Sequence, residues 1–147
     1  MIGVGDQAPD FTLPSHDGRT VRLSELLAEG PVVVYFYPAD FTPLCTAQAC
    51  MVRDQHDRLR ASGYRVVAIS PQSVASHSRF ADKHNLPFAL LADTDKSVIR
   101  AYGVSGPFGL FTRRATFLID TDGTVRDRVV GDLSVGKHAG LIGRALG

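Results

Sequence analysis

The stretch Pro31-Val-Val-Val-Tyr-Phe-Tyr37, followed directly by Pro38-Ala-Asp-Phe-Thr-Pro-Leu-Cys45, decides the fold of this chain. Its first half is a short run of β-branched and aromatic residues between prolines, which predicts a buried central strand. Thr42 and Pro43 are then typical of a helix start, where an N-cap residue precedes proline at the first helical position. Cys45 is therefore predicted to be the third residue of a helix.

A cysteine in the first turn of a helix faces unpaired backbone N–H groups and the positive end of the helix dipole. Both favour the thiolate, which is the nucleophilic form of the side chain. A helix end contributes at most about 2 kcal/mol, which is too little for full ionisation at neutral pH. We therefore expect a further cation beside Cys45.

The spacing Pro38-x3-Thr42-x2-Cys45 resembles the peroxidatic signature of the peroxiredoxins. A second cysteine, Cys50, stands five residues after the first, which is similar to the Q-type subfamily, also called bacterioferritin comigratory proteins. The resemblance implies a thiol peroxidase that reduces hydrogen peroxide and organic hydroperoxides without haem, metal or other cofactor. Two further segments carry the resemblance toward both ends of the chain, Gly5–Phe11 and Ala115–Asp120.

A peroxide needs a soft nucleophile for one oxygen and donors or positive charge for the oxygen that departs. Cys45 supplies the nucleophile, the Thr42 hydroxyl and the Cys45 backbone N–H can lie beside the peroxide, and Pro38 can shield the thiolate from water. Peroxiredoxins place an arginine two residues before a Ser/Thr-Phe pair, and Arg114 matches this position. Arg113 is the neighbouring alternative, but in an extended segment its side chain points to the opposite face.

The second cysteine cannot bridge to the first in an intact helix. Residues five apart lie about 140° apart around the axis and about 7.5 Å along it, so their Cα atoms are roughly 8–9 Å apart. A disulfide needs about 7 Å or less. The hypothesis drawn from the resemblance is that Cys45 becomes a sulfenic acid, the first helical turns unwind, and Cys50 resolves it as an intramolecular disulfide.

The pattern of elements predicts one α/β domain over residues 1–147, with a thioredoxin-like fold in which helices cover both faces of a central mixed sheet. An N-terminal hairpin is expected around Ser15–Gly18, with Ser24 capping a short helix that ends at Leu27. Gly63 should end the cysteine helix. The remaining expected elements are strands at 64–70, 88–91, 115–120 and 124–130, helices at 74–84, 96–102 and 135–146, and an irregular glycine-rich loop at 105–111.

Composition limits the partners. The 147 residues are 44% apolar, and 16 basic residues nearly balance 15 acidic ones without a basic block. Nucleic acid and anionic membranes are therefore not implied as partners. The beginning of the chain has no basic or long apolar segment, so we expect a cytoplasmic protein with redox-active rather than structural cysteines.

The resemblance implies a peroxide substrate and a thioredoxin or similar dithiol as reductant, and we expect a monomer rather than a dimer. Two rival functions stay open: a thioredoxin-like disulfide reductase, which would need a Cys-x2-Cys pair, and a chaperone-like protein of the same fold. Gln48 either orients Arg114 or faces solvent. His56 is expected to be a hydrogen-bonded core or boundary residue, and His77 and His84 are assigned no role.

Overall fold

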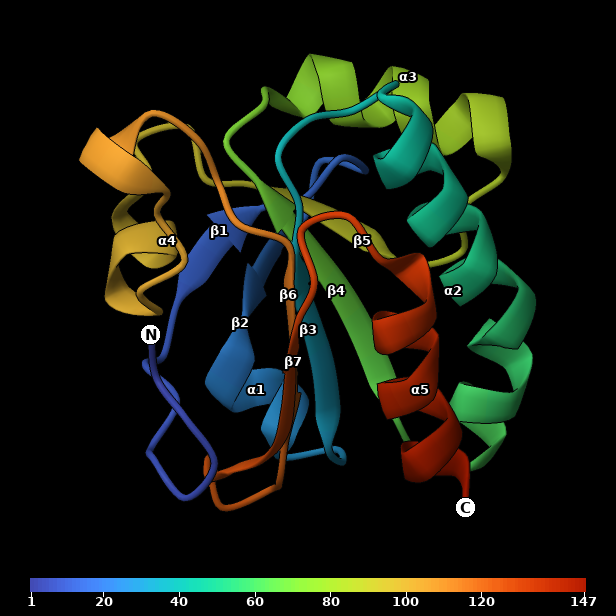
Figure 1. Ribbon diagram of the computed structural model, residues 1–147. Coiled ribbons are helices and arrows are strands. Elements are labelled where there is room, and N and C mark those ends of the chain that lie inside the picture. Colours follow the sequence, from blue (N-terminus) through green and yellow to red (C-terminus); the bar gives the residue numbers. More distant parts are fainter.

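The computed structural model describes residues 1–147 and has the predicted architecture of one mixed sheet between two layers of helices (Figure 1). The sheet has five strands in the order β5-β4-β3-β6-β7, and a separate hairpin pairs β1 with β2. The elements are, in chain order, β1 (Thr12–Pro14), β2 (Thr20–Arg22), α1 (Leu23–Leu27), β3 (Val32–Phe36), α2 (Pro43–Ala61), β4 (Arg65–Ser70), α3 (Val74–His84), β5 (Ala89–Ala92), α4 (Ser97–Ala101), η1 (Pro107–Gly109), β6 (Ala115–Ile119), β7 (Val125–Val130) and α5 (Val135–Leu146).

The central strand is β3, as the valine-rich run predicts. It pairs in parallel with β4 and antiparallel with β6, and all five of its residues are buried. Because successive side chains of a strand point to opposite faces, β3 contributes to two separate cores. Val32, Val34 and Phe36 enter the first core, while Val33 and Tyr35 enter the second.

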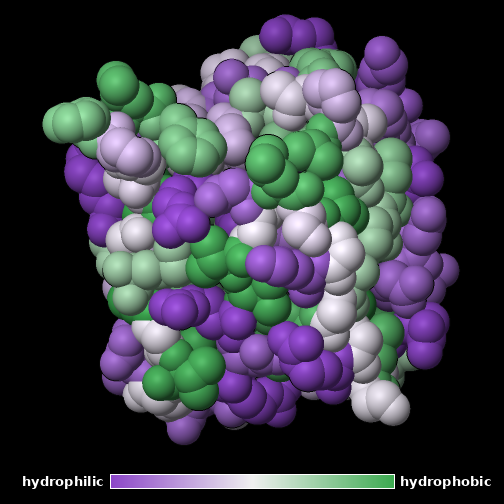
Figure 2. All heavy atoms as spheres, in the orientation of Figure 1, coloured by the Kyte–Doolittle hydropathy of each residue, from purple (hydrophilic) through white to green (hydrophobic).

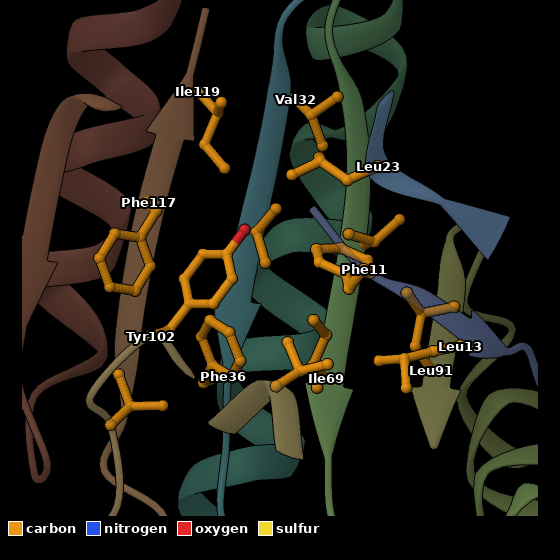
Figure 3. Packing of buried hydrophobic residues seen from close by; sticks show 14 of the residues in the cluster. Phe11, Leu13, Leu23, Val32, Phe36, Ile69, Leu91, Tyr102, Phe117 and Ile119 are labelled. Atoms are coloured by element: carbon orange, nitrogen blue, oxygen red, sulfur yellow. The ribbon is translucent and has the colours of Figure 1, made fainter. Parts of the chain in front are cut away.

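The first core lies between the sheet and the layer formed by α1, α4 and the N-terminal hairpin (Figure 3). Its centre is aromatic: the ring of Phe36 lies 5.1 Å from that of Tyr102 and 5.8 Å from that of Phe117, measured between centroids. The Tyr102 hydroxyl donates to the carbonyl of Pro9 at 2.7 Å, which ties the N-terminal segment to this core. Burial and edge-to-face packing of aromatic rings together stabilise this arrangement.

The second core lies under α2, α3 and α5. One face of α2 packs against this core, and its buried residues include Cys45, Ala49, Val52, His56 and Leu59. The helix ends as expected: Ser62 is its C-cap and Gly63 follows with φ of 90°, a conformation that glycine adopts without strain.

The prediction that Ser24 caps α1 is wrong. The helix begins at Leu23, so Ser24 lies inside it. The Ser24 backbone N–H donates to the Asp10 carboxylate at 2.9 Å, and the Leu23 N–H donates to the Phe11 carbonyl at 3.1 Å. Acceptors from the preceding loop therefore replace a local cap. By contrast, α3 and α5 have serine caps that accept backbone N–H groups.

The glycine-rich loop between α4 and β6 contains one short 3₁₀ turn, η1, rather than being wholly irregular. Its side chains are strongly exposed: Phe108 is 97% exposed and Leu110 is 80% exposed. Figure 2 shows the corresponding hydrophobic surface at the upper left, over the position of η1 in Figure 1. No helix of the structure combines the length and the apolar character that crossing a bilayer requires.

We predict that Phe36→Ala lowers the free energy of unfolding by about 3–5 kcal/mol, because it removes a fully buried ring from the first core. Urea unfolding of the reduced protein measures the change. The matched control is Phe108→Ala, which removes the same ring from an exposed position and should alter stability by less than about 0.5 kcal/mol. Similar losses in both variants would show that the first core is not organised around Phe36.

Candidate active site

Helix α2 begins a few residues after β3 ends (Figure 1), and Cys45 lies in its first turn. Thr42 is the N-cap, Pro43 is the first helical residue, and Cys45 is therefore the third, as predicted. The cysteine is 2% exposed, and its backbone N–H has no hydrogen-bond acceptor within the protein. The sulfur and a free backbone donor thus lie together at the positive end of a 19-residue helix.

The Thr42 side chain does not cap the helix. Its hydroxyl donates to the Ala39 carbonyl at 3.2 Å, which leaves the lone pairs of the hydroxyl oxygen available as acceptors. Pro38 lies half-buried in the bend between β3 and this turn. Both residues lie on the segment that leads from β3 to Cys45.

The expected cation is Arg114. Its Nη2 donates to the Cys45 Sγ at 3.2 Å, although 69 residues separate the two in sequence. Its Nη1 donates to the Gln48 Oε1 at 2.6 Å, and its Nε donates to the Asp132 backbone carbonyl at 3.3 Å. Arg114 is only 3% exposed and forms no salt bridge with a carboxylate. A buried guanidinium without an acidic partner favours negative charge on the sulfur it contacts.

Arg113 points away, as the alternation of an extended segment predicts. It forms a salt bridge with Asp132 at 3.0 Å and remains partly exposed. Burial alone would raise the pKa of Asp132, but hydrogen bonds from the Arg113 side chain and the Arg114 backbone hold that pKa below its usual value. Asp132 thus keeps Arg113 outward and fixes the backbone of Arg114.

Gln48 is buried, so the solvent-facing alternative is wrong. Its oxygen is taken by Arg114, whereas its Nε2 has no hydrogen-bond partner. The side chain therefore orients the guanidinium from the next turn of α2 and leaves one buried donor unsatisfied within the site. A buried donor without a hydrogen-bond partner is costly in free energy.

The model of the AhpC/TSA family matches residues 4–128. The chain belongs to the AhpC/TSA family. The sequence resemblance to Q-type peroxiredoxins is confirmed by this match and by the relatives below.

Peroxiredoxin Q, chloroplastic, of Oryza sativa subsp. japonica is 42% identical over 140 residues, covering 95% of this chain and 64% of the rice protein. The chain thus spans slightly less than two thirds of the length of this relative. The putative peroxiredoxin bcp of Coxiella burnetii is 43% identical over 130 residues, covering 84% of this chain and 85% of that protein. The crystal structure of peroxidoxin BcpB from Mycobacterium tuberculosis matches with a TM-score of 0.91 and 37% identity, covering 99% of this chain and 97% of that one.

Cys50 is half-buried on α2, and both cysteines are free thiols. The helix is continuous from Pro43 to Ala61, so the two sulfurs cannot join without local unwinding. The resolving role of Cys50 stays a prediction. No group of three or more His, Cys, Asp and Glu side chains is arranged around a common point that could hold a metal ion.

Sequence reasoning missed a buried network beneath the cysteine loop. The Asp40 carboxylate accepts from the Tyr37 hydroxyl at 2.6 Å, from the Ser76 hydroxyl at 2.7 Å and from His77 Nδ1 at 2.7 Å. The other ring nitrogen of His77 lies 3.1 Å from the Leu91 carbonyl. Burial opposes ionisation of Asp40, but these donors hold its pKa below the usual value. The network fastens the loop between β3 and α2 to α3 and β5.

A second buried histidine supports the start of β6. His138 Nδ1 lies 2.7 Å from the Thr116 hydroxyl, and its Nε2 lies 3.1 Å from the Gly131 carbonyl. Because a carbonyl only accepts, Nε2 carries the proton and Nδ1 accepts from Thr116. Burial is the main cause that lowers the pKa of His138, and the Arg114 charge acts in the same direction.

We predict that His138 stays neutral, with its proton on Nε2, at pH values below the ordinary histidine value of 6.5. The folded-state pKa is depressed, so this ring contributes stability that is present above the unfolded pKa and is lost as pH falls through the folded one. Ring-nitrogen NMR spectra recorded from pH 8 to 4.5 measure the titration directly. Protonation of His138 at or above pH 6.5 would contradict the assignment.

Proposed function

We propose that this protein is a thiol peroxidase that reduces hydrogen peroxide and small organic hydroperoxides. The observation that carries the proposal is the 3.2 Å contact between Arg114 Nη2 and Cys45 Sγ at the start of α2. It joins a nucleophilic sulfur, a free backbone N–H and a buried cation in one place, which is what attack on an O–O bond requires. A neighbour supports the substrate class: a Xanthomonas campestris bacterioferritin comigratory protein, 29% identical with a TM-score of 0.84, is described as having alkyl peroxide reduction activity.

In the first step the Cys45 thiolate attacks one peroxide oxygen and forms an S–O bond as the O–O bond breaks. The second oxygen departs as hydroxide or alkoxide, takes up a proton and leaves as water or alcohol. Arg114 and the Cys45 backbone N–H stabilise the developing negative charge. Since the Thr42 proton is engaged by Ala39, the Thr42 oxygen accepts the hydrogen of the bound peroxide and orients it.

The product on Cys45 is a sulfenic acid. The first turns of α2 then unwind, the Cys50 sulfur attacks the Cys45 sulfur, and the sulfenic oxygen leaves as water while a disulfide forms. A thioredoxin-type dithiol reduces this disulfide by thiol exchange, which restores both thiols and oxidises the donor. We also propose a cytoplasmic location and a monomeric state, as expected from the sequence and its family resemblance.

The two rival functions fit the site less well. A thioredoxin-like reductase needs two thiols that can bridge without unwinding the helix, whereas these two are five residues apart within continuous α2. A chaperone-like role requires neither the buried arginine at the sulfur nor the unpaired N–H beside it.

We predict that one equivalent of hydrogen peroxide removes both free thiols and two hydrogens from the wild-type protein, whereas Cys50→Ser gains one oxygen at Cys45. Intact-mass measurement with alkylation counts the thiols. Cys45→Ser is the control and should consume no peroxide. If wild type keeps both thiols at doses that leave an ordinary cysteine intact, the peroxidase proposal fails. Full thioredoxin-dependent turnover by Cys50→Ser would instead reject the resolving role alone.

We predict that Arg114→Ala slows the reaction of Cys45 with hydrogen peroxide by about a hundredfold or more, as is usual for loss of a transition-state donor. Stopped-flow measurement of single-turnover oxidation gives the rate. Arg113→Ala is the matched control because it removes a neighbouring guanidinium that does not touch the sulfur. Equal rates for Arg114→Ala and wild type would remove Arg114 from the reaction.

A further inference from the structure

A second concave site lies at the opposite end of the sheet from Cys45. It is a cleft of about 390 Å³ at the points where β4 and β5 begin, bordered by β2 and α1 on one side and by the second half of α2 on the other. His56 lines this cleft, and 11 residues of helix, or about 16 Å, separate it from Cys45. Figure 1 shows α2 running from the cysteine end of the molecule to this end.

His56 is the unusual group of the cleft. The predicted boundary position is confirmed, since the residue is 8% exposed. No group of the protein forms a hydrogen bond with either ring nitrogen, and neither nitrogen is sealed from solvent. The two other buried histidines, His77 and His138, differ from His56, because both ring nitrogens of each lie within hydrogen-bond distance of a protein group. Burial first, and then the charges of Arg60 and Arg65, lower the pKa of His56. The cleft therefore presents a neutral imidazole with one free donor and one free acceptor.

Two of the four arginines that line the cleft have no acidic partner. Arg22 and Arg60 form no salt bridge and donate no hydrogen bond, and Arg65 reaches a carboxylate only at 3.8 Å, on Glu29. Arg19 is already engaged by Asp17 at 2.7 Å. The lining holds four arginines against two glutamates, Glu25 and Glu29, so the cleft carries an excess of positive charge. Guanidinium groups bind phosphate well because their N–H groups match its oxygens in pairs.

The remaining wall is apolar. Phe88, at the entry to β5, is 4% exposed and its ring lies 6.1 Å from that of His56. Leu26 and Val66 border the same space. A small-molecule site typically combines such a wall with a few polar groups at one end, in volumes of about 300–1,000 Å³.

We propose that this cleft binds a phosphate monoester that carries a flat apolar group. The phosphate lies against His56, Arg60 and Arg65, and the apolar group packs along Phe88 and Leu26. A dianion fits better than a monoanion because more than one guanidinium there lacks an acidic partner. The imidazole N–H of His56, which donates to no group of the protein, donates to a phosphate oxygen.

The test is a titration of the reduced, ¹⁵N-labelled full chain with phenyl phosphate, followed by amide chemical shifts in a buffer without phosphate. We expect saturable shifts at His56, Arg65 and Phe88 and none at Cys45. Arg60→Gln should weaken binding by about tenfold, as expected for loss of one charge-assisted hydrogen bond. Arg58→Gln is the matched control, since it removes the same charge from the same helix outside this cleft, and it should bind as wild type does.

Two further probes separate the parts of the proposal. Inorganic phosphate and benzoate should each bind more weakly than phenyl phosphate, because one lacks the apolar group and the other lacks the second charge. The proposal is overturned if phenyl phosphate gives no saturable shifts at the cleft, if either simpler anion binds equally well, or if Arg58→Gln weakens binding as much as Arg60→Gln. Since Cys45 is not involved, none of these outcomes depends on the peroxidase proposal.

Discussion

The contact between the Arg114 guanidinium and the Cys45 sulfur is the interaction on which the active end of the molecule depends. It exists because β3 and β6 pair antiparallel with Phe36 opposite Ala115. That register sets Arg114 beside the point where the chain leaves β3 and turns toward α2. A one-residue slip in the pairing of β6 with β3 would turn the arginine to the other face of the sheet. Arg113, one residue earlier, points to that other face and is partly exposed. Sheet register, rather than proximity in sequence, therefore positions the cation.

The surroundings of this pair are rigid on one side and must move on the other. Asp40 and His77 hold the incoming loop to α3 and β5 through fully buried hydrogen bonds. Gln48 and Cys50 lie on the helix that follows, and its first turns have to unwind before the two sulfurs can meet. The structure thus separates a fixed entry loop from a helix start whose hydrogen bonds the proposed cycle would break.

Helix α2 also links the two ends of the molecule. Its buried stripe begins with Cys45 and continues to His56, which lies at the basic cleft beyond the start of β4 and β5. The two side chains differ in their contacts with the rest of the protein. Cys45 is contacted by a cation of the same chain, whereas His56 has no hydrogen-bond partner in the chain and lines a cleft in which two of four guanidinium groups have no acidic partner.

The sequence by itself determined the local structure. The valine-rich run predicts β3, Thr42 and Pro43 predict the start of α2 and hence the position of Cys45, and alternation in an extended segment distinguishes Arg114 from Arg113. These features depend on backbone preferences and side-chain periodicity over a few residues, which is why they can be read from the chain. Only the tertiary structure decided three other features. These are the cap of α1, the buried Asp40–His77 pair, and the lack of a protein hydrogen-bond partner for the ring of His56. Each depends on which groups from distant segments meet, as with Asp40 and His77, whose positions differ by 37 in sequence. No local pattern records whether a buried polar group finds a partner.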